Sequence, residues 1–250
     1  MRENFVVHPQ YEPMAAQLRD ALIHFTRKGE YVVKGDRNII KRVIIDGDEF
    51  NIKKFKTPNP IQGLVYQSLR DSKAKRSYLF ARKLMEAGIN TPFPVAYSEQ
   101  FYGGLKESYY ISRHLDYDFD FRELLHNPRF ENRKEIVRQF AAFTFKLHEN
   151  RVNFLDHSPG NTLIMDRGDG KYDFFLIDLN RMRFEDMDFK KRMFNFRRLW
   201  LSRTLVKVIS QEYAKLYSKD YEEVHALILK YSRQFQKKVN SGKMRRRRRR

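Results

Sequence analysis

Strand-like patterns are concentrated in the first half of this 250-residue chain and helix-like patterns in the second half. Three β-branched and aromatic runs between Glu30 and Lys56, the last two separated by the turn signal DGDE, predict an antiparallel meander. Apolar residues interleaved with charge predict a helix from Ile61 to Gly88. The next stretch, VAYSEQFYGGLKESYYISRHL, predicts two strands around a YGGLK turn. We therefore expect five antiparallel strands, with one helix inserted after the third.

The second half changes period. Apolar residues at steps of four, three and four, from Ile136 to Leu147, predict a helix over residues 133–149. TLIMD and DFFLIDLN predict a small hairpin, and the chain is helical in pattern from Asp188 onward. Strands segregated from helices predict an α+β fold of two lobes. We place the lobes at 1–115 and 116–240, with the acidic LDYDFD as linker and 241–250 as a basic disordered tail.

The charge balance narrows the range of partners. The chain has 50 Lys and Arg against 31 Asp and Glu, a formal net charge of +19, which favours polyanions such as nucleotides, anionic lipids or nucleic acid. There is no cysteine, so disulfides and thiolate metal sites are excluded. No secretory signal and no run of about 18 apolar residues is present. These features predict a cytoplasmic protein that is soluble or bound to a membrane surface.

The stretch FLDHSPGNTLIMD interrupts the predicted core with a polar turn. Asp156 and Asn161 have the D-x-x-x-x-N spacing of a kinase catalytic loop, and Asp178 ends the following apolar run. Phosphoryl transfer requires a carboxylate that accepts the hydroxyl proton and oxygen ligands that hold Mg²⁺. Asp156 is therefore a candidate catalytic base, and Asn161 and Asp178 are candidate metal ligands. The alternative is structural, with all three as turn or cap residues.

The nucleotide side of such a site is expected in the first half. The third predicted strand, FNIKKFK, places Lys53 where kinases have a phosphate-binding lysine, and ATP is the expected cofactor beside Mg²⁺. Lys54 is the competing register, because adjacent strand residues point to opposite faces. A GxGxxG loop is missing, and the KGDRN turn, from Gly35 to Asn38, is the candidate phosphate cover.

Several stretches resemble the lipopolysaccharide kinase (Kdo/WaaP-type) family, particularly its members from Bacteroidetes-like bacteria: NIKKFKTPNPIQG, SKAKRSYLFARKLMEAGINTPFPVAY, KESYYISRHLDYDFDFRELL, FTFKLHENRVNFLDHSPGNTLI and FFLIDLNRMRF. The resemblance implies a protein-kinase-like fold. It also implies ATP- and metal-dependent phosphorylation of a sugar of the lipopolysaccharide inner core, notably Kdo on lipid A. It makes Asp156 the base, Asn161 and Asp178 the metal ligands and Lys53 the phosphate-binding lysine.

The chain departs from the family pattern at the partner of the catalytic lysine. Lys75 stands at the helix position of the glutamate that pairs with the catalytic lysine, and Glu86 is too close to the helix end to replace it. Asn180 and Arg181 match a family pattern without an assigned role. A basic cluster is the candidate contact with the inner face of the inner membrane. It comprises Lys190, Lys191, Arg192, Arg197 and Arg198.

Other functions remain open at this point. A protein or small-metabolite kinase would have a similar nucleotide site, and the missing glutamate and Gly-rich loop would suit a pseudokinase scaffold. A nucleic-acid-binding module would place aromatic residues on exposed strands, whereas residues such as Phe140 and Phe143 follow core periodicity, so no specific nucleic acid is expected. The histidines lack metal-ligand spacing, and His157 is only a candidate for substrate contact.

Overall fold

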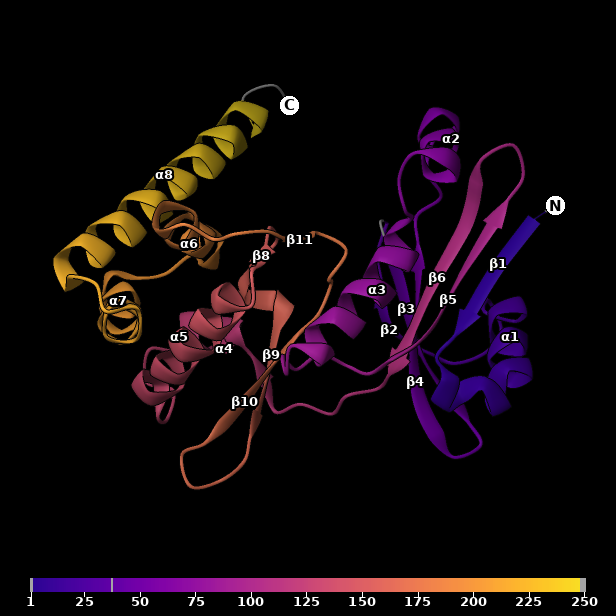
Figure 1. The fold of residues 1–250 in the computed structure, drawn as a ribbon, viewed down its shortest axis with the longest axis horizontal. Coiled ribbons are helices and arrows are strands. Elements are labelled where there is room, and N and C mark those ends of the chain that lie inside the picture. Colours follow the sequence, from indigo (N-terminus) through magenta and orange to yellow (C-terminus); the bar gives the residue numbers. More distant parts are fainter. Residues whose placement is uncertain (1, 37, 248–250) are drawn as a thin grey trace. The chain divides into compact units, whose positions relative to one another are not determined.

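The computed structural model describes residues 2–36 and 38–247 (Figure 1). The chain divides into two compact units, Met1–Asp116 and Tyr117–Arg250. The first unit is built on an antiparallel sheet and the second is mainly helical, which confirms the α+β class. Among the described helices, none has the combination of length and apolar character that crossing a membrane requires.

The first unit has a six-stranded antiparallel sheet of order β1-β5-β6-β4-β3-β2. Its strands are β1 (Arg2–Val7), β2 (Glu30–Lys34), β3 (Asn38–Ile45), β4 (Asp48–Phe55), β5 (Pro94–Phe101) and β6 (Leu105–Arg113). The DGDE turn joins β3 to β4, with Asp46 and Gly47 at positive φ as a tight hairpin turn requires. The prediction of five strands missed β1, a short run that pairs with β5, a partner about 90 residues away.

Four helical segments accompany this sheet, not the single helix predicted from Ile61 to Gly88. They are η1 (Pro9–Met14), α1 (Ala15–Ile23), α2 (Pro60–Ser68) and α3 (Lys73–Glu86). The predicted helix breaks between α2 and α3 because each has its own N-cap. Asn59 accepts a hydrogen bond from the Gln62 amide (2.8 Å), and Ser72 accepts one from the Lys75 amide (3.1 Å).

The two faces of the sheet carry different cores. On one face, Phe50 and Ile52 pack with residues of α1. On the other, Phe55 and Tyr97 pack with residues of α3. Because side chains alternate along a strand, Lys53 shares the α3 face with Phe55, and its neighbour Lys54 lies on the α1 face.

The second unit is organised around α5 (Arg133–Glu149), whose bounds agree with the predicted helix. Its buried stripe, which includes Ile136 and Phe140, packs against α7, and α7 in turn packs against α8, in one continuous core. The other helical segments are α4 (Phe121–His126), η2 (Pro159–Asn161), α6 (Phe189–Asn195), η3 (Phe196–Leu199), α7 (Arg203–Tyr217) and α8 (Tyr221–Arg247).

Two small sheets position the loops of this unit. The first has the order β10-β9-β7, with β7 (Phe119–Asp120), β9 (Thr162–Asp166) and β10 (Tyr172–Leu176). The second pairs β8 (Val152–Phe154) with β11 (Met182–Phe184). Together they bring the loop after β8 beside the loop after β10.

The predicted disordered tail is helical as far as the structure describes it. Residues 241–247 continue α8, and 248–250 lie outside the described residues. Lys, Arg and Met are good helix formers, and the preceding turns of α8 are held by the core through Val224 and Ile228. The prediction was wrong for 241–247 because it relied on low complexity alone.

Candidate active site

The loop after β8 and the loop after β10 are hydrogen-bonded to each other at two points. The Leu155 amide donates to the carbonyl of Arg181 (3.0 Å), and the Ile177 amide donates to the carbonyl of Asn161 (3.0 Å). These bonds lie directly beside Asp156 and Asp178. The structure therefore brings together the three polar residues that the sequence singled out in this unit.

The turn from Asp156 to Asn161 is held by its own polar groups. The Asp156 carbonyl accepts hydrogen bonds from the Ser158 amide (2.7 Å) and from Asn161 Nδ2 (2.8 Å). Because the amide nitrogen of Asn161 is engaged with the backbone, its Oδ1 is the end of the side chain that can act as an oxygen ligand.

Asp178 has an unusual backbone conformation for a non-glycine residue. Its φ is 57°, in the left-handed region, which aspartate and asparagine adopt more readily than other non-glycine residues. Its Oδ1 accepts a hydrogen bond from Asn180 Nδ2 at 2.6 Å. This contact gives Asn180, which had no role in the sequence analysis, the role of orienting the Asp178 carboxylate.

The residues present suit Mg²⁺. Among the described residues, no group of three or more His, Asp and Glu side chains gathers as a metal cluster would. Asn161 and Asp178 supply hard oxygen donors, and Mg²⁺ is commonly held by one or two carboxylates with phosphate and water oxygens completing its shell. The donor set therefore fits a metal that binds together with a nucleotide.

Two arginines lie on the two oxygens of Asp156. Arg198 Nη2 is 2.8 Å from Oδ1, and Arg181 Nη1 is 3.6 Å from Oδ2. The Asp156 side chain is 18% exposed. Sequence reasoning did not assign Arg198 to the site, because it comes from η3, far along the chain, and no local motif marks it.

The basic cluster predicted for Lys190 to Arg198 is not a single solvated surface. Arg192 is buried, and its Nη1 forms an ion pair with Glu149 (2.5 Å). Its Nε donates to the carbonyl of Met187 at 2.7 Å. With Arg198 engaged on Asp156, two of the five cations serve the interior or the candidate site.

His157 is buried, so the prediction that it contacts substrate was wrong. Its Nδ1 lies 3.0 Å from Asn195 Oδ1, and His148 Nε2 lies 3.3 Å from the same oxygen. Asn195 Nδ2 donates to Asn153 Oδ1 and to the Phe154 carbonyl, both at 3.0 Å. This network anchors the start of the Asp156 loop to α6.

The network makes stability depend on pH. Burial lowers the pKa of His157 to about 4 and that of His148 to about 3. An unfolded histidine titrates near 6.5, so below that pH the unfolded chain binds more protons. The stabilisation is complete above pH 6.5 and is lost as the pH falls toward the folded-state values.

Between pH 7 and pH 5, each buried histidine should contribute a loss of about 2 kcal/mol in the free energy of unfolding. Urea denaturation at the two pH values measures it. His157→Gln, which keeps an N–H for Asn195, should remove about half of the loss. An equal pH dependence in wild type and His157→Gln would contradict this role.

Lys53 and the β2–β3 turn lie near each other in the first unit. Ile40 pairs with Lys53 and Asn38 pairs with Phe55, so the turn lies beside the end of β4 that carries the lysine. The Gly35 amide donates to the Asn38 carbonyl (3.2 Å), and residue 37 of the predicted KGDRN turn lies outside the described residues. This placement supports the predictions for Lys53, Gly35 and Asn38, which remain predictions.

Lys54, the alternative candidate for the phosphate-binding lysine, makes a different set of contacts. Lys54 forms an ion pair with Glu107 of β6, and its Nζ lies 5.2 Å from the centre of the Tyr109 ring. The helix residue Lys75 pairs with Asp71 (2.7 Å). Lys54 thus pairs with a residue of the neighbouring strand, and Lys75 pairs with a residue just before the start of its own helix.

The two lysine positions can be separated by substitution. Lys53→Met should lower kcat/KM for ATP by about 10- to 100-fold, because a charged hydrogen bond to phosphate is lost. Lys54→Met should lower the free energy of unfolding by about 1 kcal/mol or less and leave kcat/KM unchanged, since it loses only a partly exposed ion pair. Steady-state kinetics on both variants would contradict the assignment if the effects were reversed.

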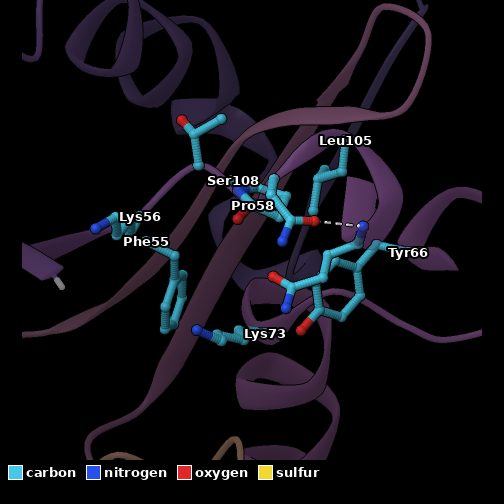
Figure 2. Close-up of a pocket in the computed structure, with 10 residues that line it drawn as sticks. Phe55, Lys56, Pro58, Tyr66, Lys73, Leu105 and Ser108 are labelled. Atoms are coloured by element: carbon cyan, nitrogen blue, oxygen red, sulfur yellow. Dashed lines mark hydrogen bonds between the residues drawn. The ribbon is translucent and has the colours of Figure 1, made fainter. Parts of the chain in front are cut away.

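Two cavities flank α2 within the first unit. The one in Figure 2, of about 250 Å³, lies between α2, the end of β4 and the start of β6, and the close-up shows Phe55, Lys73 and Tyr66 around it. The second, of about 410 Å³, is lined by Arg2, Asn4, Tyr66, Leu69, Arg70, Asp71, Lys75, Glu99 and Phe101. The sequence analysis did not predict either cavity.

Comparison with known proteins identifies the family. The model of the lipopolysaccharide kinase (Kdo/WaaP) family matches residues 61–226, which is more than half of the chain. Among solved structures, a complex described as WaaP with acyl carrier protein is similar in fold, with a TM-score of 0.67 and 16% identity over 95% of this chain and 99% of that one. No curated protein matches. The chain therefore belongs to the lipopolysaccharide kinase (Kdo/WaaP) family, whose members are kinases.

Proposed function

We propose that this kinase transfers the γ-phosphoryl group of ATP to a hydroxyl of Kdo in the inner core of lipopolysaccharide. The observation that carries the proposal is the hydrogen-bonded pair of loops that holds Asp156, Asn161 and Asp178 together. Family membership supports the sugar acceptor. The choice of Kdo among the core sugars rests on the resemblance of the sequence.

In the proposed reaction, Asp156 accepts the proton of the acceptor hydroxyl as its oxygen attacks the γ-phosphorus. The bond to the β–γ bridging oxygen breaks, and ADP leaves. Asn161 and Asp178 would hold Mg²⁺, which when bound neutralises charge on the phosphates. Lys53 would bind the α- and β-phosphates, and the turn from Gly35 to Asn38 would cover them.

An acceptor panel tests this proposal. Wild type and Asp156→Ala are incubated with ATP, Mg²⁺ and either Kdo-lipid A, a heptose-containing core fragment or a generic protein substrate, and product mass is measured. A Kdo product heavier by one phosphoryl group, absent with the variant, is expected. Transfer only to heptose or to protein would reject Kdo as the acceptor, and absence of nucleotide binding would favour the pseudokinase scaffold.

We also propose that α2 makes the peripheral contact with the anionic inner membrane. Its aliphatic side chains Ile61 and Leu64 are 77% and 56% exposed, and Leu69, the C-cap residue directly after it, is 83% exposed. In Figure 1 the helix stands by the tip of the β5–β6 hairpin. Gly63 and Gly104 allow this close backbone approach, since a Cβ on Gly104 would lie 2.9 Å from the Gly63 carbonyl carbon.

The surroundings of α2 are basic. Lys56, Arg70 and Lys106 are exposed on the segments that flank it, and Tyr102 of the hairpin is 73% exposed. Exposed aliphatic residues rimmed by cations are typical of a surface that rests on an anionic bilayer. This surface replaces the Lys190–Arg198 cluster as the candidate membrane contact.

Leu64→Glu and Leu69→Glu should each weaken binding to phosphatidylglycerol vesicles by about tenfold or more, because each loses the burial of a leucine side chain. Ile23→Glu, at an equally exposed residue of α1, is the matched control and should bind as wild type does. Vesicle co-sedimentation measures the effect. Equal vesicle binding by all three variants would reject α2 as the membrane contact. Absence of vesicle binding by the wild-type protein would reject a membrane contact altogether.

A further inference from the structure

The catalytic loop supplies no cation of its own. The sequence DHSPGN, from Asp156 to Asn161, contains neither Lys nor Arg. The positive charge beside Asp156 comes instead from two other segments. Arg198 belongs to η3, and Arg181 lies between β10 and β11.

The two arginines are held differently. The Arg198 guanidinium lies over the ring of Phe235 from α8, 5.4 Å from its centre, and the side chain is 32% exposed. Its Nε is buried and has no hydrogen-bond partner within the part of the chain that the structure describes. Arg181 is 63% exposed. One guanidinium is therefore fixed at the carboxylate, and the other reaches it from solvent.

An arginine that binds only the catalytic base would hinder catalysis. It competes with the acceptor hydroxyl for the carboxylate oxygens. A guanidinium has five N–H donors in a planar fork that fits carboxylate and phosphate groups. An oxyanion on the acceptor would engage these donors and leave a carboxylate oxygen for the hydroxyl.

We propose that Arg198 and Arg181 form an oxyanion subsite beside Asp156 that receives a carboxylate or phosphate carried by the acceptor near its reacting hydroxyl. The inference rests on the proposed function, in which Asp156 is the base toward the acceptor. In an in-line transfer the hydroxyl lies between base and phosphorus, so groups that share the carboxylate oxygens lie nearest the acceptor. The acceptor class is thus an acidic or phosphorylated sugar.

Kinetics of Arg198→Gln with matched acceptors test the subsite. The acceptors are a Kdo glycoside, its neutral methyl ester and a hexose phosphate. For the acceptor whose anion binds the subsite, the variant should raise KM by about 10- to 100-fold, which corresponds to the loss of one charged hydrogen bond, and should leave kcat nearly unchanged. The kinetic constants for the neutral methyl ester should not change. The control is Arg197→Gln, whose guanidinium packs 3.8 Å from the centre of the Phe194 ring.

Two kinetic results would overturn the proposal. An equal loss of kcat on the charged acceptor and on the ester would make Arg198 a positioning residue for Asp156. A parallel loss of acceptor-free ATP hydrolysis would assign the arginine to the transferred phosphoryl group. If the Kdo glycoside and the hexose phosphate respond differently, the difference identifies whether carboxylate or phosphate is the recognised group.

A binding measurement tests the subsite without turnover. The chain has a single tryptophan, Trp200, whose ring centre lies 5.9 Å from that of Phe235, the ring beneath Arg198. Titration with the Kdo glycoside or the hexose phosphate should change Trp200 fluorescence saturably in wild type and in Arg197→Gln, but not in Arg198→Gln. This result would support the subsite even if no sugar were phosphorylated, whereas no response to either anion in wild type would overturn it.

Discussion

Asp156→Asn should lower kcat for sugar phosphorylation by about 10²- to 10⁴-fold, the usual contribution of a positioned general base. Asparagine keeps the shape of the side chain but cannot accept the hydroxyl proton. The Asp156 carbonyl, which receives the hydrogen bonds of Ser158 and Asn161, is untouched, so the loop should keep its conformation. Steady-state kinetics with ATP and a core-sugar acceptor measure the loss.

Asp169→Asn is the matched control for this variant. Asp169 lies in the β9–β10 turn with a φ of 51°, a conformation that asparagine tolerates, and it is exposed. The control should keep wild-type kcat. Asp156→Asn with a kcat within a factor of about two of wild type would reject the carboxylate as the base, since general base catalysis predicts a much larger effect.

Asp178→Asn should have the second large effect. It should lower kcat/KM by about 10²- to 10³-fold at fixed Mg²⁺, because a bound metal lowers the energy of the charged transition state by several kcal/mol. Asparagine accepts the left-handed backbone with φ of 57°, so the substitution removes charge without straining the chain. The rate is measured against Mg²⁺ concentration, and ATP binding is measured by calorimetry with Mg²⁺ and with EDTA.

A charge-matched control separates metal binding from general electrostatics. Asp173→Asn on β10 loses an exposed ion pair with Arg167 and should leave the Mg²⁺ dependence unchanged. If Asp178→Asn showed the same Mg²⁺ dependence as wild type, its role as a metal ligand would be contradicted. The role of Asn180 in orienting Asp178 would then also lose its basis.

The local part of the site could be predicted because its functional residues lie close together in the sequence. The spacing of Asp156 and Asn161, and the aspartate at the end of an apolar run, depend on one turn and one hairpin. The same holds for α5, whose periodicity alone marked the helix from Arg133 to Glu149. Local pattern is enough where a single element carries the feature.

Long-range parts of the site left no such signal. Asn195 joins His148 and His157 through contacts about 40 residues apart in the chain, and Arg198 reaches Asp156 over a similar separation. Their residue types are compatible with any solvated helix, and only tertiary packing distinguishes them. The prediction that the cations from Lys190 to Arg198 form one basic surface was wrong because neighbouring side chains in this segment have different surroundings: Arg192 is buried and Arg198 contacts Asp156.

The predicted boundaries of helices and strands were wrong where helix capping or strand pairing, rather than local composition, decides where an element begins or ends. The helix predicted from Ile61 to Gly88 is two helices because Ser72 caps the second, and β1 exists because it pairs with β5. The polybasic tail is helical through residue 247 because it extends a helix that the core already holds. Each miss reflects a contact that composition does not encode.

Transfer of the γ-phosphoryl group to a Kdo-containing lipopolysaccharide precursor is the most direct test of the central claim. Purified protein is incubated with labelled ATP, Mg²⁺ and the precursor, beside Asp156→Asn, and label and product mass are followed. The account predicts a labelled product heavier by one phosphoryl group with wild type and none with the variant. Wild type that binds Mg²⁺-ATP but transfers no label to any core sugar would contradict it.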